Sequence, residues 1–202
     1  MSIPNYRMVK YRDELVALLA RKPINHQEKI LEHDNIKDAH AYCAVNQLSG
    51  QKSGPLIENF IRVNQGWVKN RASDHIGDCK DTNGVDQEIK ISLGGSTFDK
   101  FNYVQLRPSH HADYLLTAFY LSPTNAASSA GELFIFKIPK ASMLELIANY
   151  GQYAHGTRKK NGAITLKDLK TTHNLKEYAL RPKYGSPLWK EMLKFKINED
   201  AL

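Results

Sequence analysis

The segment that most constrains the fold is a short alternating stretch that directly follows a tight-turn sequence. Residues 85–92 read VDQEIKIS, so that Val85 and Ile89 fall on one face of a strand and polar residues on the other. The preceding Asp-Thr-Asn-Gly sequence at 81–84 favours a hairpin turn, because Asn and Gly tolerate positive φ. Residues 75–80 are therefore predicted to pair with this stretch as an antiparallel strand.

Two apolar runs and a bracketed helix follow the hairpin. Residues 113–121 and 132–138 have the length and composition of central strands. Pro139 favours a helix start and Gly151 favours its end, so a helix is predicted between them. A last helix is predicted near residues 187–196.

The first third of the chain is expected to be helical. Residues 8–20 place apolar side chains at helical spacing, and residues 26–48 continue with a more polar, helix-compatible stretch. A third helix is predicted to open at Ser53-Gly54-Pro55, where proline fits a first helical turn, and it includes Glu58. Its expected buried face consists of Leu56, Phe60, Ile61 and Val63.

These elements predict one α/β domain over residues 1–202, with a mixed β-sheet flanked by helices. Residues 1–52 would form a helical N-terminal region, residues 53–150 the α/β core, and residues 151–202 a C-terminal region. A chain of 202 residues commonly forms a single domain.

Several classes of protein are disfavoured by the composition. No run of about 18 apolar residues occurs, which argues against a membrane span. The N-terminal sequence lacks the apolar stretch of a secretory signal, so a cytoplasmic location is expected. Cys43 and Cys79 are too few and too far apart for a zinc site or a disulfide framework, and free thiols are expected.

The basic charge of the chain is concentrated in its last quarter. Residues 151–202 hold 11 Lys or Arg against 5 Asp or Glu, whereas residues 1–150 hold 17 against 16. Such a surface is expected of a protein that contacts phosphates, although a solvated basic face would have the same composition. A turn is predicted at residues 160–162, where Arg158, Lys159, Lys160 and Asn161 are candidate DNA contacts.

Two carboxylates and an amine converge in the predicted hairpin. Glu88 and Lys90 lie two apart on one strand and share a face, and Asp78 lies beside them on the other strand. Hard oxygen ligands suit Mg²⁺, and the Ile89 carbonyl is a plausible further ligand. The ammonium of Lys90 could orient a water or stabilise charge on a phosphate. An ordinary solvent-facing carboxylate–lysine pair is the structural alternative.

Three other aspartates near the hairpin could replace Asp78 as a ligand, namely Asp74, Asp81 and Asp86. Asp81 belongs to the predicted turn and Asp86 precedes the Glu-x-Lys pair, so Asp78 is the preferred candidate.

An aspartate, a hairpin of about ten residues and then Glu-x-Lys resembles the active-site signature of the PD-(D/E)xK nuclease superfamily. Gly77 stands where the nominal motif has proline. The resemblance covers residues 53–150 and implies a restriction-endonuclease-like fold. It further implies that Asp78 and Glu88 hold Mg²⁺, that Lys90 orients the attacking water, and that Glu58 approaches the metal site from its helix.

The function implied is that of a type II restriction enzyme. Such an enzyme hydrolyses double-stranded DNA at specific sites as a homodimer, leaving 5′-phosphate and 3′-hydroxyl ends. Arg107, His110 and His111 are further candidate DNA contacts. A structure-specific repair or junction-cleaving nuclease, and a non-catalytic nucleic-acid-binding protein, are the alternatives.

Overall fold

The computed structural model describes most of the chain: residues 17, 20, 24–74, 76–94, 99–120, 131–171 and 174–202, with residues 72 and 158 described by their backbone alone. The helix predicted over residues 8–20 lies outside the described residues, apart from positions 17 and 20.

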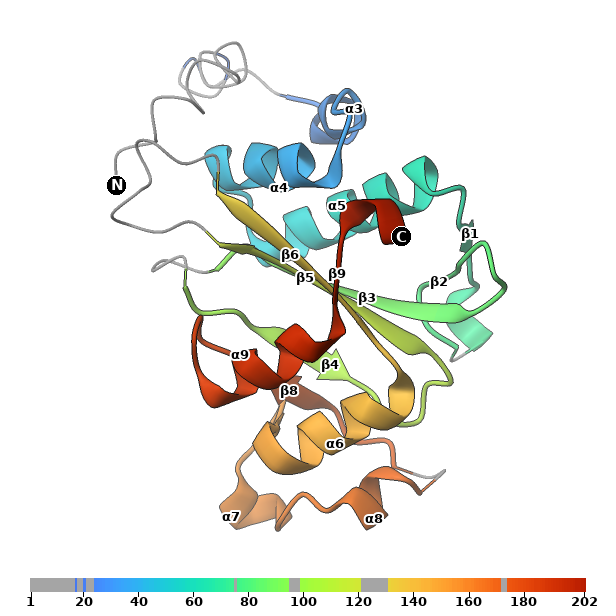
Figure 1. Ribbon diagram of the computed structural model, residues 1–202, viewed down its shortest axis with the longest axis vertical. Coiled ribbons are helices and arrows are strands. Elements are labelled where there is room, and N and C mark those ends of the chain that lie inside the picture. The colour runs from blue at the N-terminus through green and yellow to red at the C-terminus, as the bar shows by residue number, and fades with distance from the viewer. Residues whose placement is uncertain are drawn as a thin grey trace.

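A six-stranded mixed sheet forms the centre of the molecule, in the order β1-β2-β3-β5-β6-β9 (Figure 1). Only β3 and β5 are parallel neighbours, and the other pairs are antiparallel. The predicted α/β class with a mixed sheet is therefore confirmed. The strands are β1 (Val68–Lys69), β2 (Cys79–Lys80), β3 (Asp86–Ser92), β5 (Asp113–Tyr120), β6 (Glu132–Ile138) and β9 (Lys196–Ile197).

The predicted hairpin is present, but its first strand is short. The Asp81 amide donates to the Val85 carbonyl at 2.9 Å and closes the turn. Strand β2 spans two residues rather than 75–80, because Gly77, with a φ of +98°, departs from the extended conformation just before it, and a 3-10 turn, η1 (Ala72–Asp74), lies further upstream. Val85 lies outside the strand and is exposed, so its predicted place beside Ile89 is wrong.

Helices α3 (His26–Leu31), α4 (Ile36–Val45) and α5 (Gly50–Asn64) lie on one side of the sheet, with α4 and α5 against its strands and α3 packed on these two helices. Asn25 and Asn35 cap the first two, each accepting a backbone N–H three residues ahead. Leu115 and Phe119 of β5 pack against these helices.

Helix α5 begins earlier than predicted. The Ser53 amide already donates to the Ser49 carbonyl at 2.8 Å, so helical bonding is established before Pro55. Phe60 and Ile61 are buried as predicted, whereas Val63 is 51% exposed because it faces away from the sheet at the end of the helix.

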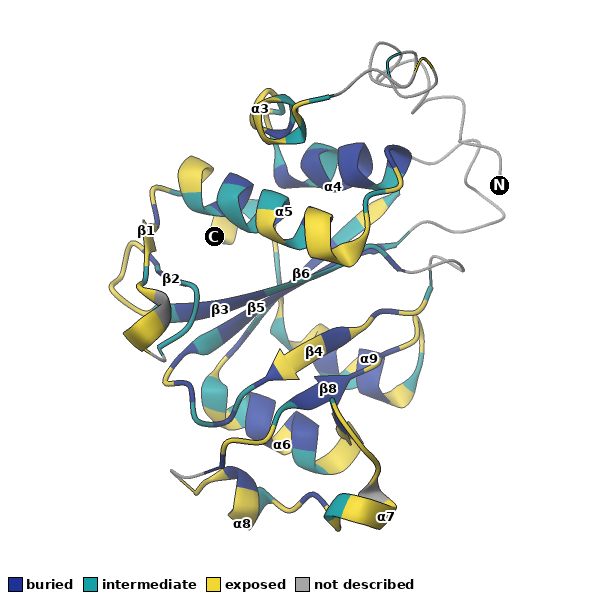
Figure 2. Ribbon diagram, turned by 180° about the vertical axis from the view of Figure 1, so that it is seen from behind, coloured by how far each residue is buried: buried dark blue, intermediate teal, exposed yellow. Residues whose placement is uncertain are grey.

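Helices and a second, three-stranded sheet cover the other face (Figures 1 and 2). The second sheet was not predicted. Alternation along β5 turns Tyr114, Leu116 and Ala118 toward this layer. The elements are α6 (Lys140–Tyr150), α9 (Pro187–Met192), β4 (Tyr103–Leu106), β8 (Tyr178–Leu180) and β7 (Gln152–Tyr153), in the strand order β4-β8-β7.

Helix α6 has the predicted bounds and ends at Gly151, where a Cβ would lie 2.4 Å from the Ile147 carbonyl oxygen. The C-terminal region differs from the prediction. The turn expected at 160–162 is wrong, because Lys160 and Asn161 belong to a short helix, α7 (Arg158–Asn161), and a second short helix is α8 (Leu166–Leu169). The last helix stops at Met192, because the chain then forms η2 (Leu193–Phe195) and pairs as β9 with β6, before η3 (Glu199–Ala201).

No helix within the described ranges combines the length and the apolar character needed to cross a membrane. Cys43 and Cys79 are buried free thiols, as predicted.

Candidate active site

The backbone at the start of β2 holds Asp78 against β3. The Asp78 amide donates to the Gln87 carbonyl at 2.8 Å, and an Asp78 carboxylate oxygen accepts the Ile89 amide at 2.7 Å. Gly77 has a φ of +98°, and a Cβ there would lie 2.7 Å from the Gln87 carbonyl oxygen. Glycine at this position therefore permits the close approach that places Asp78 beside the centre of β3.

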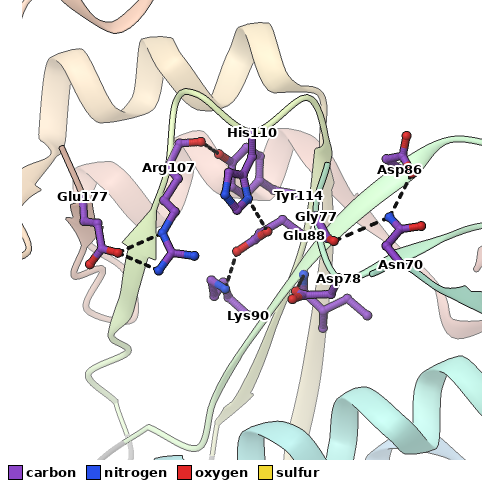
Figure 3. Close-up of polar contacts among 11 residues, drawn as sticks. Asn70, Gly77, Asp78, Asp86, Glu88, Lys90, Arg107, His110, Tyr114 and Glu177 are labelled. Atoms are coloured by element: carbon purple, nitrogen blue, oxygen red, sulfur yellow. Dashed lines mark hydrogen bonds and ion pairs between the residues drawn. The ribbon is translucent and has the colours of Figure 1, made fainter. Parts of the chain in front are cut away.

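Glu88 and Lys90 project from β3 on the same face and meet each other (Figure 3). The Lys90 Nζ lies 2.5 Å from Glu88 Oε1, and the two side chains are 20% and 3% exposed. The alternative of a solvent-facing carboxylate–lysine pair is wrong for Glu88, because the segment from Arg107 to His110 lies over this face and Glu88 is buried. The pair is thus a partly buried ion pair rather than an ordinary surface contact.

The carboxyl groups of Asp78 and Glu58 both have raised pKa values, because each is partly buried near another negative charge. Burial, and next the negative charge of Glu88, raise the pKa of Asp78. Glu58 reaches the same region from α5, where burial and then the charge of Asp78 raise the pKa of Glu58. Lys90 acts in the opposite direction on both groups. A further cation near Asp78 and Glu88 would therefore be electrostatically favourable.

The donor set fits a hard divalent cation. Asp78 Oδ1 accepts no hydrogen bond from any described residue, and its Oδ2 bonds only to the Ile89 amide among them. In an extended strand, the carbonyl and the amide of one residue point to the same side, so the Ile89 carbonyl points to the side of β3 on which Asp78 lies. Two carboxylates and a carbonyl match the few protein oxygens that Mg²⁺ takes, with water and phosphate completing the shell. In the described part of the chain, no group of three or more His, Cys, Asp or Glu has a metal-binding arrangement.

The alternative aspartates have other partners or lie apart. Asp81 is buried in the turn and accepts hydrogen bonds from Asn83, Val85, Gln87 and Lys137. Desolvation alone would raise the pKa of Asp81, but the hydrogen bonds from Val85, Lys137 and Asn83 and the charge of Lys137 together lower it. Asp86 contacts Asn70 and Lys80, and Asp74 is exposed in η1.

His110 lies in the cluster, a contact that sequence reasoning missed. Its Nδ1 is 3.1 Å from Glu88 Oε2, and the residue is buried. The contact depends on the parallel pairing of β3 with β5, which places Gln87 opposite Asp113 and brings the segment before β5 to the start of β3. Only a prediction of that strand order could have revealed it.

The other predicted DNA contacts lie outside the cluster. Arg107 forms an ion pair with Glu177, in which its Nη2 and Nε lie 2.6 and 2.8 Å from the same carboxylate oxygen, Oε1. His111 is exposed. Helix α7 carries Arg158, Lys159, Lys160 and Asn161 beyond α6, on the side away from the six-stranded sheet (Figure 1). Lys159 and Lys160 are exposed, whereas the Asn161 carbonyl accepts the Tyr153 hydroxyl.

No protein-family model matches the chain, and no curated protein has a matching sequence.

Proposed function

We propose that this chain is a Mg²⁺-dependent endonuclease with a restriction-endonuclease-like fold that hydrolyses double-stranded DNA at specific sites, as a type II restriction enzyme does. The observation that carries the proposal is the convergence of Asp78, Glu88 and Lys90 on one region of β3, with the Glu88 carboxylate buried and that of Asp78 partly buried. Hard oxygen ligands for Mg²⁺ and a positioned cation are the components that a metal-dependent hydrolysis of a phosphodiester uses.

Each residue has a distinct task in the proposed reaction. Asp78, Glu88 and the Ile89 carbonyl would hold Mg²⁺, which when bound supplies a Lewis acid that stabilises charge on the phosphate. The Lys90 ammonium donates hydrogen bonds, so it can orient a water or stabilise a phosphate oxygen. Glu58 adds negative charge beside Asp78 and thereby strengthens the preference of the site for a cation.

The basic C-terminal region supports DNA as the substrate. The exposed Lys159 and Lys160 are suited to phosphate contacts, which position a protein on DNA without reading its sequence. A type II enzyme acting on a symmetric site would work as a cytoplasmic homodimer, with one copy of the cluster facing each strand.

The direct test is incubation with unmethylated phage DNA and Mg²⁺, followed by sequencing of the fragment ends. Discrete fragments with 5′-phosphate and 3′-hydroxyl ends would support the proposal, and their absence under a wide range of conditions would count against it. Cleavage that depends on branches or flaps instead of sequence would favour a structure-specific nuclease. Binding without cleavage, unchanged by Asp78→Ala, would favour a non-catalytic DNA-binding protein.

A further inference from the structure

The Glu88 carboxylate is held from two sides. Lys90 meets Oε1 at 2.5 Å and His110 meets Oε2 at 3.1 Å, so that both oxygens have a partner within the protein (Figure 3). The Glu88 side chain is 3% exposed, and water has little access to replace either partner. The orientation of this carboxylate therefore depends on Lys90 and His110 together.

We propose that His110 is a positioning residue of the proposed active site, whose Nδ1–H fixes the Glu88 carboxylate in the orientation needed to bind the metal ion. An ionised carboxylate only accepts hydrogen bonds, so the proton of this contact resides on Nδ1. The inference rests on the proposed function, because it assigns His110 a task in that same site.

The segment that carries His110 is anchored on both sides. The Arg107 carbonyl accepts the His110 amide and the Tyr114 hydroxyl, each at 3.1 Å. The Arg107 guanidinium is tied to Glu177, which precedes β8 of the second sheet. These contacts determine where the imidazole ring lies relative to Glu88.

The same segment also packs against the hairpin that carries Asp78. A Cβ at Gly77 would lie 2.8 Å from the Ala112 Cβ, so the two backbones approach as closely as glycine allows. Asp78 and His110 are thus mounted on adjoining parts of the structure, with Glu88 bonded to His110 and electrostatically coupled to Asp78. Movement of His110 would be transmitted to Glu88 directly.

Loss of the Nδ1–H donor would leave a buried carboxylate oxygen without its partner and free the side chain to rotate. Partners that orient a metal ligand typically contribute 10–100-fold to metal affinity or activity. We expect a loss of this size for a variant that lacks the donor, and little loss for one that keeps it.

Asparagine and leucine form a matched pair at this position. His110→Asn retains an N–H donor near the place of Nδ1, whereas His110→Leu has a similar shape without the donor. Four quantities are measured in the full-length protein: the affinity for Ca²⁺ by calorimetry without DNA, the affinity for DNA in Ca²⁺, the single-turnover rate of DNA cleavage in Mg²⁺, and the melting temperature. His110→Ala repeats the test if the leucine variant does not fold.

The inference predicts that His110→Leu loses roughly 10–100-fold in Ca²⁺ affinity and in cleavage, while His110→Asn remains within a few-fold of wild type. Equal losses in both variants, or wild-type values in both, would overturn it. Weakened DNA binding with unchanged Ca²⁺ affinity would instead identify His110 as a DNA contact and also overturn it. A wild-type protein that neither binds a divalent cation nor cleaves DNA would refute the proposed function and this inference together.

Discussion

His40 ties helix α4 to the central sheet and makes stability sensitive to mild acid. Its Nδ1 lies 2.8 Å from the Ile36 carbonyl and its Nε2 lies 2.8 Å from the Thr117 hydroxyl of β5. Complete burial lowers the pKa of His40 from 6.5 to about 4, although the hydrogen bond to Ile36 opposes this shift. The folded protein therefore keeps His40 neutral at a pH at which the unfolded chain protonates it.

The resulting loss of stability has a definite sign and size. A histidine whose folded pKa is lowered contributes fully above pH 6.5, and its contribution falls as the pH drops from there toward 4. One pKa unit corresponds to about 1.4 kcal/mol, so the free energy of unfolding should fall by about 2 kcal/mol between pH 7.5 and pH 5.0 from this group alone. The raised pKa values of Asp78 and Glu58 act in the opposite direction as the pH falls, but they act equally in wild type and in a variant that lacks His40.

Urea unfolding of the wild type and of His40→Gln at intervals across this range measures the effect. Glutamine offers similar hydrogen bonds but does not titrate. Between pH 7.5 and pH 5.0, the free energy of unfolding of His40→Gln should therefore fall by about 2 kcal/mol less than that of wild type. His155→Gln, at an exposed side chain, controls for the substitution and should follow wild type. Parallel curves for wild type and His40→Gln would refute the reasoning.

Three further predictions concern the proposed site and its DNA contacts. Asp78→Asn should raise the melting temperature in metal-free buffer, because the charge of Asp78 is unfavourable in the folded state. Mg²⁺ should raise the melting temperature of wild type but not that of this variant. A lower melting temperature of the variant without metal, or stabilisation of the variant but not of wild type by Mg²⁺, would contradict this. Ca²⁺ should support DNA binding without appreciable cleavage, because its coordination geometry is looser than that of Mg²⁺, and specific cutting that persists in excess EDTA would contradict a metal-dependent reaction. Replacing Lys159 and Lys160 with Gln should flatten the slope of log affinity against log salt by roughly 0.9 for each phosphate that the variant no longer neutralises, on specific and random DNA alike. An unchanged slope in binding titrations would show that these two lysines do not touch the DNA backbone.

Local sequence signals predicted the central elements of the fold. Proline and glycine bracket α6, and predominantly apolar runs form β5 and β6, so these elements could be located without knowledge of the tertiary structure. The second sheet was missed because β7 and β8 span only two and three residues and depend on pairing between distant segments. Strand β9 was missed for the same reason.

The candidate site was predictable in part. Asp78, Glu88 and Lys90 lie within one hairpin, so their convergence follows from strand periodicity and a turn sequence. Periodicity shows which residues share a face but not what covers that face, and the burial of Glu88 was therefore missed. The approach of His110 depends on a parallel strand pairing over a long sequence separation, which no local pattern encodes.

The most direct test of the central claim compares two acidic residues of the same strand. Glu88 and Asp86 lie two apart on β3 and share a face, but only Glu88 contacts Lys90 and His110. Single-turnover cleavage of the DNA substrate in Mg²⁺ is measured for wild type, Glu88→Gln and Asp86→Asn, with binding in Ca²⁺ checked for each. We expect Glu88→Gln to reduce the rate by at least about 100-fold, the scale of losing one electrostatic stabiliser, while Asp86→Asn stays near wild type. Near-normal cleavage by Glu88→Gln, or an equal loss in both variants, would contradict the assignment of Glu88 to the active site.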